Sequence, residues 1–348
     1  MKQFINTLQK KVSNIFLISA IACSIASCDS VLNYDEGDCS VEFRVRFKYD
    51  YNMKYANAFA NEVERVTLYA FDKDGKFIYQ KTDEGTKLQA DDYSMVVDID
   101  PGEYRLVAWA GLTNESYAIP LLTPGISDID ELTVKTNRTG QTRADNGEIS
   151  DLVNKRLASL WHGESLQTLT RAGQEKVITV SLVKDTNTFR IVLQQMQGAS
   201  LQADMFDFSI FDDNGWLNYD NSLLKDNLLT YQPYFRTEGS VTRSTRAGEE
   251  TTPVSVVVAE ITVGRLMAEK NPRLRITNKE TGMVVLSIPL VDYLLLTQQE
   301  GHNSMTPQEY LDRQDEYSLT FFLDSNRMWL NTEILINGWT IRPNNADL

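Results

Sequence analysis

Cysteine and histidine are scarce in this sequence, and their scarcity excludes whole classes of site. The chain has three cysteines and two histidines. Cys23 and Cys28 fall in a leader segment described below, so Cys39 alone remains as a free thiol and no intramolecular disulfide can form. A zinc site needs about four cysteine or histidine ligands, which one thiol with His162 and His302 cannot supply. We expect no disulfide, no metal site and no cofactor.

Positive charge is also in short supply. The 34 lysines and arginines face 48 acidic residues, which gives a net charge of −14. A chain this acidic repels phosphate backbones, so we expect no nucleic-acid partner. The leader carries three lysines and no acidic residue, and its removal would take the net charge from −14 to −17. Attachment to a membrane would therefore have to come from a lipid.

Sequence motifs for catalysis are lacking as well. No Gly-x-Ser-x-Gly elbow is present, and Cys39 lies outside any glycine-framed turn. Trp161 and His162 are interpreted as a packed aromatic ring at the end of a helix and a locally hydrogen-bonded histidine, in preference to a catalytic base. Asp72-Lys73-Asp74-Gly75 lacks the glutamate that closes a calcium loop and is interpreted as a hairpin turn. We predict no enzyme and no small-molecule substrate.

The longest apolar run, residues 15–26, is too short to cross a bilayer, which takes ~20 residues. It follows Lys2, Lys10 and Lys11, as in a secretory signal peptide. Ile25-Ala26-Ser27-Cys28 ends the run and is typical of the lipobox of bacterial lipoproteins. We predict a signal peptide over residues 1–27 and acylation of Cys28, because two or more acyl chains anchor a protein stably. The alternatives are an ordinary signal peptide with a chance cysteine, or use of Cys23.

Period-2 alternation of apolar and polar residues begins after an acidic tether, residues 28–39. Residues 40–47 alternate strictly, which predicts a strand with one buried face. Residues 66–71 and 77–79 predict a hairpin around the turn at 72–75. Residues 94–99 and 104–110 are predicted to pair through a type II turn at Asp100-Pro101-Gly102-Glu103.

Further strands are predicted over 177–183, 189–193, 254–263, 274–277, 283–290, 317–323 and 333–341. Two helices are predicted: one over 151–160 capped by Ser150, and a short one capped by Thr306 with Pro307 in its first turn. Three polar segments, 135–149, 168–176 and 239–252, each contain Thr-Arg-Ala and are interpreted as exposed loops. Arginine-directed proteolytic processing there is the alternative.

A weak internal repeat suggests two modules. Residues 71–77 and 211–217 each combine an apolar strand, an acidic turn with glycine and an aromatic restart. The offset is about one domain length, which predicts two tandem β-sandwiches, 40–184 and 185–348. The tryptophans (Trp109, Trp161, Trp216, Trp329 and Trp339) could form a platform for sugars, but Trp109 and Trp339 lie in alternating strands, where a core position is expected.

Several stretches together resemble one family, the fimbrial anchor lipoproteins of type V pili. The resemblance lies in residues 66–75, in 100–112 (DPGEYRLVAWAGL), in 160–163 (LWHG), in 315–319 (DEYSL) and in 334–339 (ILINGW). It implies a mainly β fold of two tandem transthyretin-like Greek-key β-sandwiches with a few short helices. It also implies an outer-membrane lipoprotein facing the outside of the cell. Cys28 falls on the lipidated cysteine of the family, and Asp29, Asp35, Glu36 and Asp38 resemble its acidic export signal.

The resemblance further implies fimbrial subunits as protein partners. Polymerising subunits of these pili lose their first strand after cleavage at an arginine, and a strand from a neighbour fills the groove. An anchor needs its first strand as the tether, so we expect residues 40–47 to stay in place. Coupling would then use the C-terminal end, 333–348, or an edge of the second module. The candidate partner-binding residues are Glu333, Ile334, Leu335, Ile336, Asn337, Gly338, Trp339, Thr340 and Ile341.

Three other functions fit the sequence less well. A fimbrial tip or adhesin subunit of the same superfamily would share most of its features. A surface glycan-binding lipoprotein would show an exposed aromatic row with polar partners. A secreted hydrolase would need a carboxylate pair, which the sequence does not single out.

Overall fold

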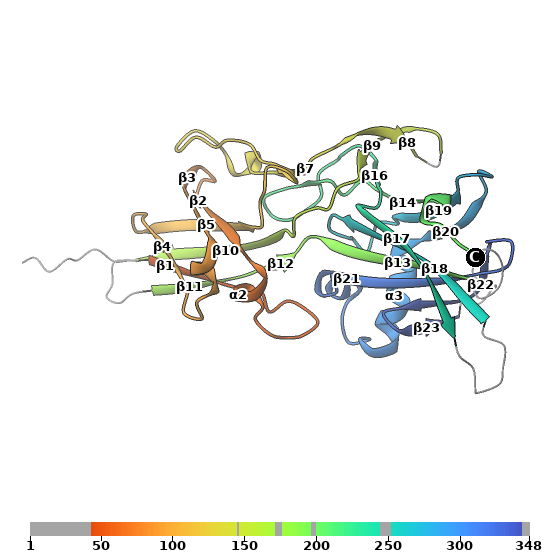
Figure 1. The fold of residues 1–348 in the computed structure, drawn as a ribbon. Helices are drawn as coiled ribbons and strands as arrows, with labels where there is room; N and C mark the ends of the chain where they lie inside the picture. The colour runs from red at the N-terminus through yellow and green to blue at the C-terminus, as the bar shows by residue number, and fades with distance from the viewer. Residues whose placement is uncertain (1–42, 145, 171–175, 196–199, 244–251, 343–348) are drawn as a thin grey trace, which may run out of the picture. The chain divides into compact units, whose positions relative to one another are not determined.

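The computed structural model describes residues 43–144, 146–170, 176–195, 200–243 and 252–342. In these residues the protein is mainly β, with several sheets and three short α-helices (Figure 1). This confirms the mainly β class predicted from alternating residues. Cys28, the acidic tether and Cys39 lie outside the described residues, as do most of the segments 168–176 and 239–252.

The first strand lies in the middle of a three-stranded sheet. Strand β1 (Phe43–Lys48) pairs in parallel with β11 (Lys176–Ser181) and antiparallel with β4 (Met95–Val97). Its alternation places Phe43, Val45 and Phe47 on one face, where none is more than 2% exposed. The predicted pairing of 94–99 with 104–110 is wrong, because the second of these segments is already flanked by strands on both sides.

A five-stranded sheet follows the order β12-β10-β5-β2-β3. Its strands are β12 (Val183–Lys184), β10 (Trp161–Leu169), β5 (Gly102–Ala110), β2 (Arg65–Asp72) and β3 (Phe77–Glu84). The β2–β3 hairpin is confirmed, with Gly75 at φ 80° in its turn. A type II turn before β5 is not formed: it needs a positive φ at Gly102, which instead begins the strand.

The predicted helix over 151–160 is wrong. Strand β9 (Ile149–Val153) occupies its first part, pairing with β8 (Gly140–Arg143) and, in parallel, with β16 (Leu229–Tyr231). The Ser150 hydroxyl does not cap a helix but lies 2.6 Å from the Thr230 hydroxyl in a buried contact. The apolar residues of the segment serve two different cores, so their helix-like spacing is coincidental.

Two six-stranded sheets contain most of the second half. One follows the order β17 (Phe235–Arg243), β18 (Thr252–Val263), β13 (Asn187–Gln195), β21 (Glu316–Leu323), β22 (Trp329–Ile336), β23 (Trp339–Ile341). The other follows β20 (Val284–Pro289), β19 (Arg273–Asn278), β14 (Phe206–Asp212), β16, β9, β8. Side chains from both sheets build one core cluster that includes Phe189, Phe208 and Phe321, each 0% exposed.

The three helices are short. They are α2 (Phe59–Glu62), α3 (Leu290–Gly301) and α4 (Pro307–Arg313), and single 3₁₀ turns occur at Gly85–Gln89, Ile129–Glu131 and Ala203–Met205. The predicted cap of α4 is confirmed, since the Thr306 hydroxyl accepts a bond from the Glu309 N–H at 3.1 Å. Helix α3 was not predicted: it follows β20 directly, and no side chain caps it.

Backbone pairing crosses the predicted module boundary at residues 184 and 185. Strand β7 (Val134–Thr136) pairs with β15 (Trp216–Leu217) and with β6 (Tyr117–Ala118) in a small sheet. Strand β9 likewise pairs with β16 from the second half. Strands β7 and β9, which precede the boundary, thus pair with strands β15 and β16, which follow it. The division between residues 184 and 185 remains a prediction.

Candidate functional site

The C-terminal residues predicted to bind a partner form a hairpin rather than one strand. Strands β22 and β23 meet at Asn337 and Gly338, whose φ angles are 49° and 86°. Both angles lie in the left-handed region, as a two-residue type I′ turn requires. The Asn337 side chain also accepts a bond from the Ser318 N–H at 2.7 Å, which fixes the turn to the neighbouring strand β21.

The hairpin has a buried face and an unpaired edge. Ile334 and Ile336 are 0% exposed and Ile341 is 7% exposed, so these side chains belong to the core. Strand β23 is the last strand of its sheet, and the described residues place no strand along its outer side. Trp339 is 49% exposed, contrary to the core position expected for it, whereas Trp109 is 0% exposed as predicted.

Unpaired N–H and C=O groups along an edge can bind an extended segment of another chain. The remaining predicted residues suit such an edge. Glu333 and Leu335 are half-buried, while Thr340 is exposed beside Trp339. The predicted set therefore splits into a core part and an accessible part, and the accessible part is the turn at Asn337 and Gly338 with Trp339 and Thr340 of strand β23.

The opposite situation holds at β1. Backbone partners flank the strand on both sides, and Phe47 stacks on Phe59 with ring centroids 5.7 Å apart. Arg44 donates to the Ser94 hydroxyl at 3.4 Å. Both arginines of the strand, Arg44 and Arg46, are thus built into the middle of a sheet.

His162 is a structural residue. Its Nε2–H donates to the Tyr219 carbonyl oxygen at 2.7 Å, and its ring lies 4.7 Å from the Trp109 ring. Burial lowers the pKa of His162 to about 4, so the ring is neutral at pH 7. The hydrogen bond reaches a distant part of the sequence, and Trp161 begins strand β10 instead of packing a helix end.

A buried carboxylate lies where the chain passes from β12 to β13. Asp185 is 0% exposed, and its Oδ1 accepts a bond from the Asn221 amide at 2.8 Å. The Arg265 guanidinium approaches to 3.8 Å but forms closer bonds to Asp312, at 2.8 and 3.0 Å. Burial raises the pKa of Asp185 to about 7. Such a group makes the free energy of unfolding depend on pH.

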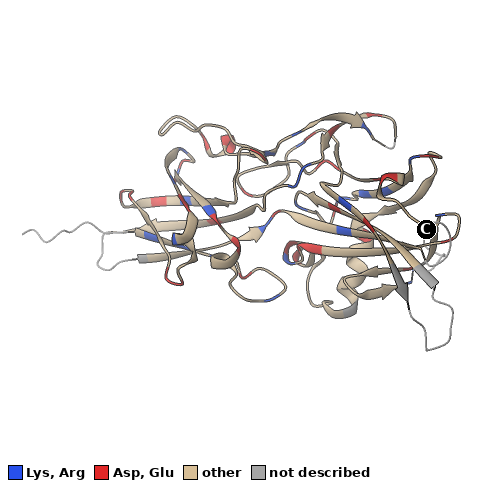
Figure 2. Cartoon of the chain, in the orientation of Figure 1, with Lys and Arg blue, Asp and Glu red and all other residues tan. Residues whose placement is uncertain are grey.

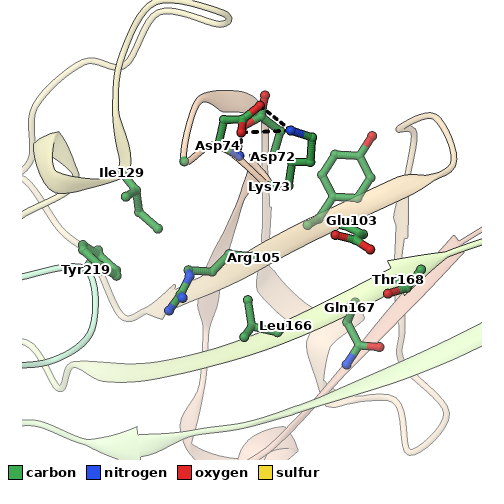
Figure 3. Close-up of a pocket in the computed structure, with 12 residues that line it drawn as sticks. Asp72, Lys73, Asp74, Glu103, Arg105, Ile129, Leu166, Gln167, Thr168 and Tyr219 are labelled. Atoms are coloured by element: carbon green, nitrogen blue, oxygen red, sulfur yellow. Dashed lines mark hydrogen bonds and ion pairs between the residues drawn. The ribbon is translucent and has the colours of Figure 1, made fainter.

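An open hollow of about 590 Å³ lies at one end of the five-stranded sheet (Figure 3). Its lining comes from the β2–β3 turn, the start of β5, the end of β10, the 3₁₀ turn at Ile129 and the segment containing Tyr219. The Asp72 carboxylate accepts bonds from the N–H groups of Asp74 and Lys76, each at 2.9 Å. This confirms the hairpin turn there, and within the described residues no cluster of three ligating side chains could hold a metal ion. No local sequence signal predicts the hollow, because its residues come together only through the sheet register and through the loops that contain Ile129 and Tyr219.

Two further properties concern the distribution of charge and the length of the helices. Acidic and basic residues are intermingled along the strands in the view of Figure 2. None of the helices in the described part of the chain is long and apolar enough to span a membrane.

Comparison with known proteins identifies the family. The family model described as fimbrillin-A associated anchor proteins Mfa1 and Mfa2 matches residues 35–345. A candidate adhesin from Bacteroides thetaiotaomicron is 36% identical, with 87% of this chain and 97% of that chain aligned at a TM-score of 0.75. A candidate polysaccharide-binding protein from the same organism is 35% identical, with 88% and 99% of the two chains aligned at a TM-score of 0.74.

The fimbrial anchor protein Mfa2 from Porphyromonas gingivalis shares the fold, with a TM-score of 0.60 at 18% identity over 87% of this chain and 99% of that one. A search of curated proteins found no match. The sequence resemblance to fimbrial anchors is confirmed by the family match, which spans nearly all of the chain after the leader. The chain belongs to the family of fimbrillin-A associated anchor proteins Mfa1 and Mfa2.

Proposed function

We propose that this protein is an outer-membrane lipoprotein that anchors a type V pilus to the cell surface. Acylated Cys28 holds it in the membrane, on the side that faces outward, and strand-mediated coupling joins it to a fimbrial subunit. The observation that carries the proposal is the unpaired outer edge of β23, with Trp339 half-exposed beside it. The family match supports fimbrial subunits as the partners.

The proposal assigns different tasks to the two ends of the chain. The first strand carries the tether, and its enclosure between β11 and β4 keeps the tether attached under load. Cleavage at Arg44 or Arg46 would require the middle strand of a sheet to open first, so β1 is not released as in a polymerising subunit. The last strand offers backbone groups to an incoming segment.

We further propose that the chain comprises two tandem transthyretin-like Greek-key modules, 40–184 and 185–348. The repeat between 71–77 and 211–217 supports this division: in each copy a strand of a large sheet, β2 or β14, leads into an acidic turn and a new strand, β3 or β15. The strand exchange through β7 and β9 would then join the two modules.

The coupling is tested by deletion of residues 337–348, which removes the turn and β23. Deletion from residue 334 is less informative because it would also remove the core residues Ile334 and Ile336. Cells that make the shorter chain should keep it in the outer membrane but shed their pili, and fimbrial subunits should no longer co-purify with it. A matched deletion of residues 343–348 leaves β23 intact and should keep pili attached.

Pili that stay fixed to cells carrying the 337–348 deletion would refute coupling through β23. The lipid assignment has its own test, since Cys28→Ala should release the protein from membranes. Continued acyl labelling of that variant would contradict acylation at Cys28.

A tip or adhesin subunit is the second candidate, because a relative 36% identical is described as a candidate adhesin. The two functions predict different locations. Gold-labelled antibody should mark the cell-proximal base of isolated pili if the protein is an anchor, and the distal end if it is a tip subunit.

A further inference from the structure

We propose that the hollow at the end of the five-stranded sheet is a binding site for a neutral oligosaccharide. The inference concerns a different part of the molecule from β23 and does not depend on pilus coupling. Its volume, about 590 Å³, lies in the range of small-molecule sites. It combines exposed apolar surface with convergent polar groups, which is the combination that a sugar ring with hydroxyls requires.

The floor of the hollow is apolar in a place where a solvated strand would carry a polar residue. Leu166 on β10 is 69% exposed and lies directly opposite Arg105 on β5. Ile129 and the half-buried ring of Tyr219 flank this floor on one side, and Glu103 and Gln167 lie on the other (Figure 3). Amphipathic rings such as tyrosine offer an apolar surface to the C–H groups of a sugar together with a polar tip.

The polar groups around the floor are held in place but retain free bonding capacity. Arg105 is fixed by Glu164 at 3.2 Å and by the Tyr219 ring, whose centroid lies 5.7 Å from the guanidinium carbon. Lys73 pairs with Asp74 at 2.8 Å, with both side chains exposed. Within the described residues, no hydrogen bond is formed by the Glu103 carboxylate or the Tyr219 hydroxyl.

Charge defines the class of ligand. Three acidic residues of the lining (Asp72, Asp74 and Glu103) face two basic ones (Lys73 and Arg105). Both basic side chains already pair with carboxylates and the acidic residues outnumber them, so the net charge of the lining disfavours a phosphate, sulfate or sialic acid group. Uncharged hydroxyl-rich ligands are therefore favoured, with carboxylates and a tyrosine hydroxyl to bind their O–H groups.

Neutral oligosaccharides could come from the cell's own surface polysaccharide or from other organisms, so the test has two arms. The full-length protein in detergent is applied to an array of neutral tri- and tetrasaccharides of glucose, galactose, mannose and N-acetylglucosamine, with sialylated trisaccharides as charged controls. In parallel it is applied to neutral polysaccharide purified from the envelope of the producing cells. Binding in at least one arm, with none to the sialylated controls, is the expected result.

Two variants locate the binding. Leu166→Glu places a charge on the floor and Tyr219→Ala removes the wall, and each should weaken binding at least tenfold while the thermal unfolding curve stays close to that of the parent. Leu121→Glu is the matched control, since Leu121 is 98% exposed and lies outside the hollow. Absence of binding in both arms overturns the proposal, as does binding that Leu166→Glu and Tyr219→Ala leave unchanged. Neither outcome affects pilus attachment, which is read separately from the 337–348 deletion.

Discussion

The first and the last described strands of this protein differ in the properties that decide whether a strand can leave its sheet or pair with a segment of another chain. Strand β1 has neighbours on both sides and a face of side chains no more than 2% exposed. Strand β23 has one neighbour, three residues and a tryptophan that is 49% exposed. Both are β-strands at one end of the described residues, yet only the second has an unpaired backbone edge.

The comparison shows that the position of a strand within its sheet, and not its closeness to a chain terminus, decides whether its backbone is available for pairing. Removing β1 would leave two strands unpaired and an apolar groove open, whereas removing β23 would make β22 the new edge and take one side chain, Ile341, from the core. The same fold can thus hold β1 firmly within its sheet and leave the outer edge of β23 unpaired. Three predictions test this difference.

The largest expected effect comes from truncating one aromatic side chain in each strand. Phe47→Ala removes a ring that is 2% exposed and stacked on Phe59, so the free energy of unfolding should fall by about 3–5 kcal/mol. Trp339→Ala removes a half-exposed ring and should cost only about 1 kcal/mol. Urea denaturation of the two variants and the parent measures both values. Equal losses in the free energy of unfolding would contradict the view that β1 is part of the core and β23 a replaceable edge.

A rise in pH should reduce the hydrogen-exchange protection of amides in β1 and leave that of amides in β23 unchanged. The pKa of Asp185 is about 7 in the folded protein, against an ordinary value of 3.8, so between these pH values the folded state holds a proton that the unfolded state has released. The free energy of unfolding therefore falls as pH rises from 4 to 7, by at most about 4 kcal/mol for this group. Burial raises the pKa of Asp212 to about 7 as well, which adds a fall of the same sign.

Asp185→Asn should reduce this dependence, and Asp207→Asn, at an accessible carboxylate paired with Lys279, is the matched control. Hydrogen exchange, corrected for the intrinsic rate, should show amides of β1 losing protection with rising pH because they exchange through global unfolding. Amides of β23 exchange through local opening and should not follow. An unchanged pH slope in Asp185→Asn would remove Asp185 as its source.

The smallest effect is expected at the turn of the last hairpin. Gly338 has φ 86° with open space around it, so Gly338→Ala should cost about 1 kcal/mol through backbone strain alone. Exchange should become faster at 339–341, and in β1 it should rise by no more than the loss of about 1 kcal/mol in global stability requires. Gly140→Ala on the edge strand β8 is a suitable control, because Gly140 has no positive φ and no atom within 4 Å of an added Cβ. A rise in β1 exchange beyond that of the measured loss in global stability would show that the two ends are coupled.

The sequence predicts the elements whose pattern is local. Apolar and polar alternation located β1, β2, β13 and β21, and the Thr306 cap located α4, because each signal lies within a few residues. The Asn337-Gly338 pair is a strong hairpin signal that the alternating reading of 333–341 passed over.

Long-range contacts explain the remaining errors. The spacing of Val153, Leu157 and Leu160 matches a helix, but Val153 and Leu157 pack in one core and Leu160 in another. Nothing local distinguishes that case from an amphipathic helix. The hollow was beyond prediction for the same reason: Arg105, Leu166 and Tyr219 meet only through strand register and through a loop that follows β15.

The parallel pairing of β1 with β11 has a mechanical consequence. A pull on the chain ahead of residue 43 acts along the axis of β1, so it loads the ladders to β11 and β4 in shear, and many backbone bonds resist at the same moment. A strand peeled from an edge would give way one bond at a time. If the protein anchors a pilus as proposed, the enclosed first strand would withstand drag from the filament, with a strength that depends on how many bonds break together.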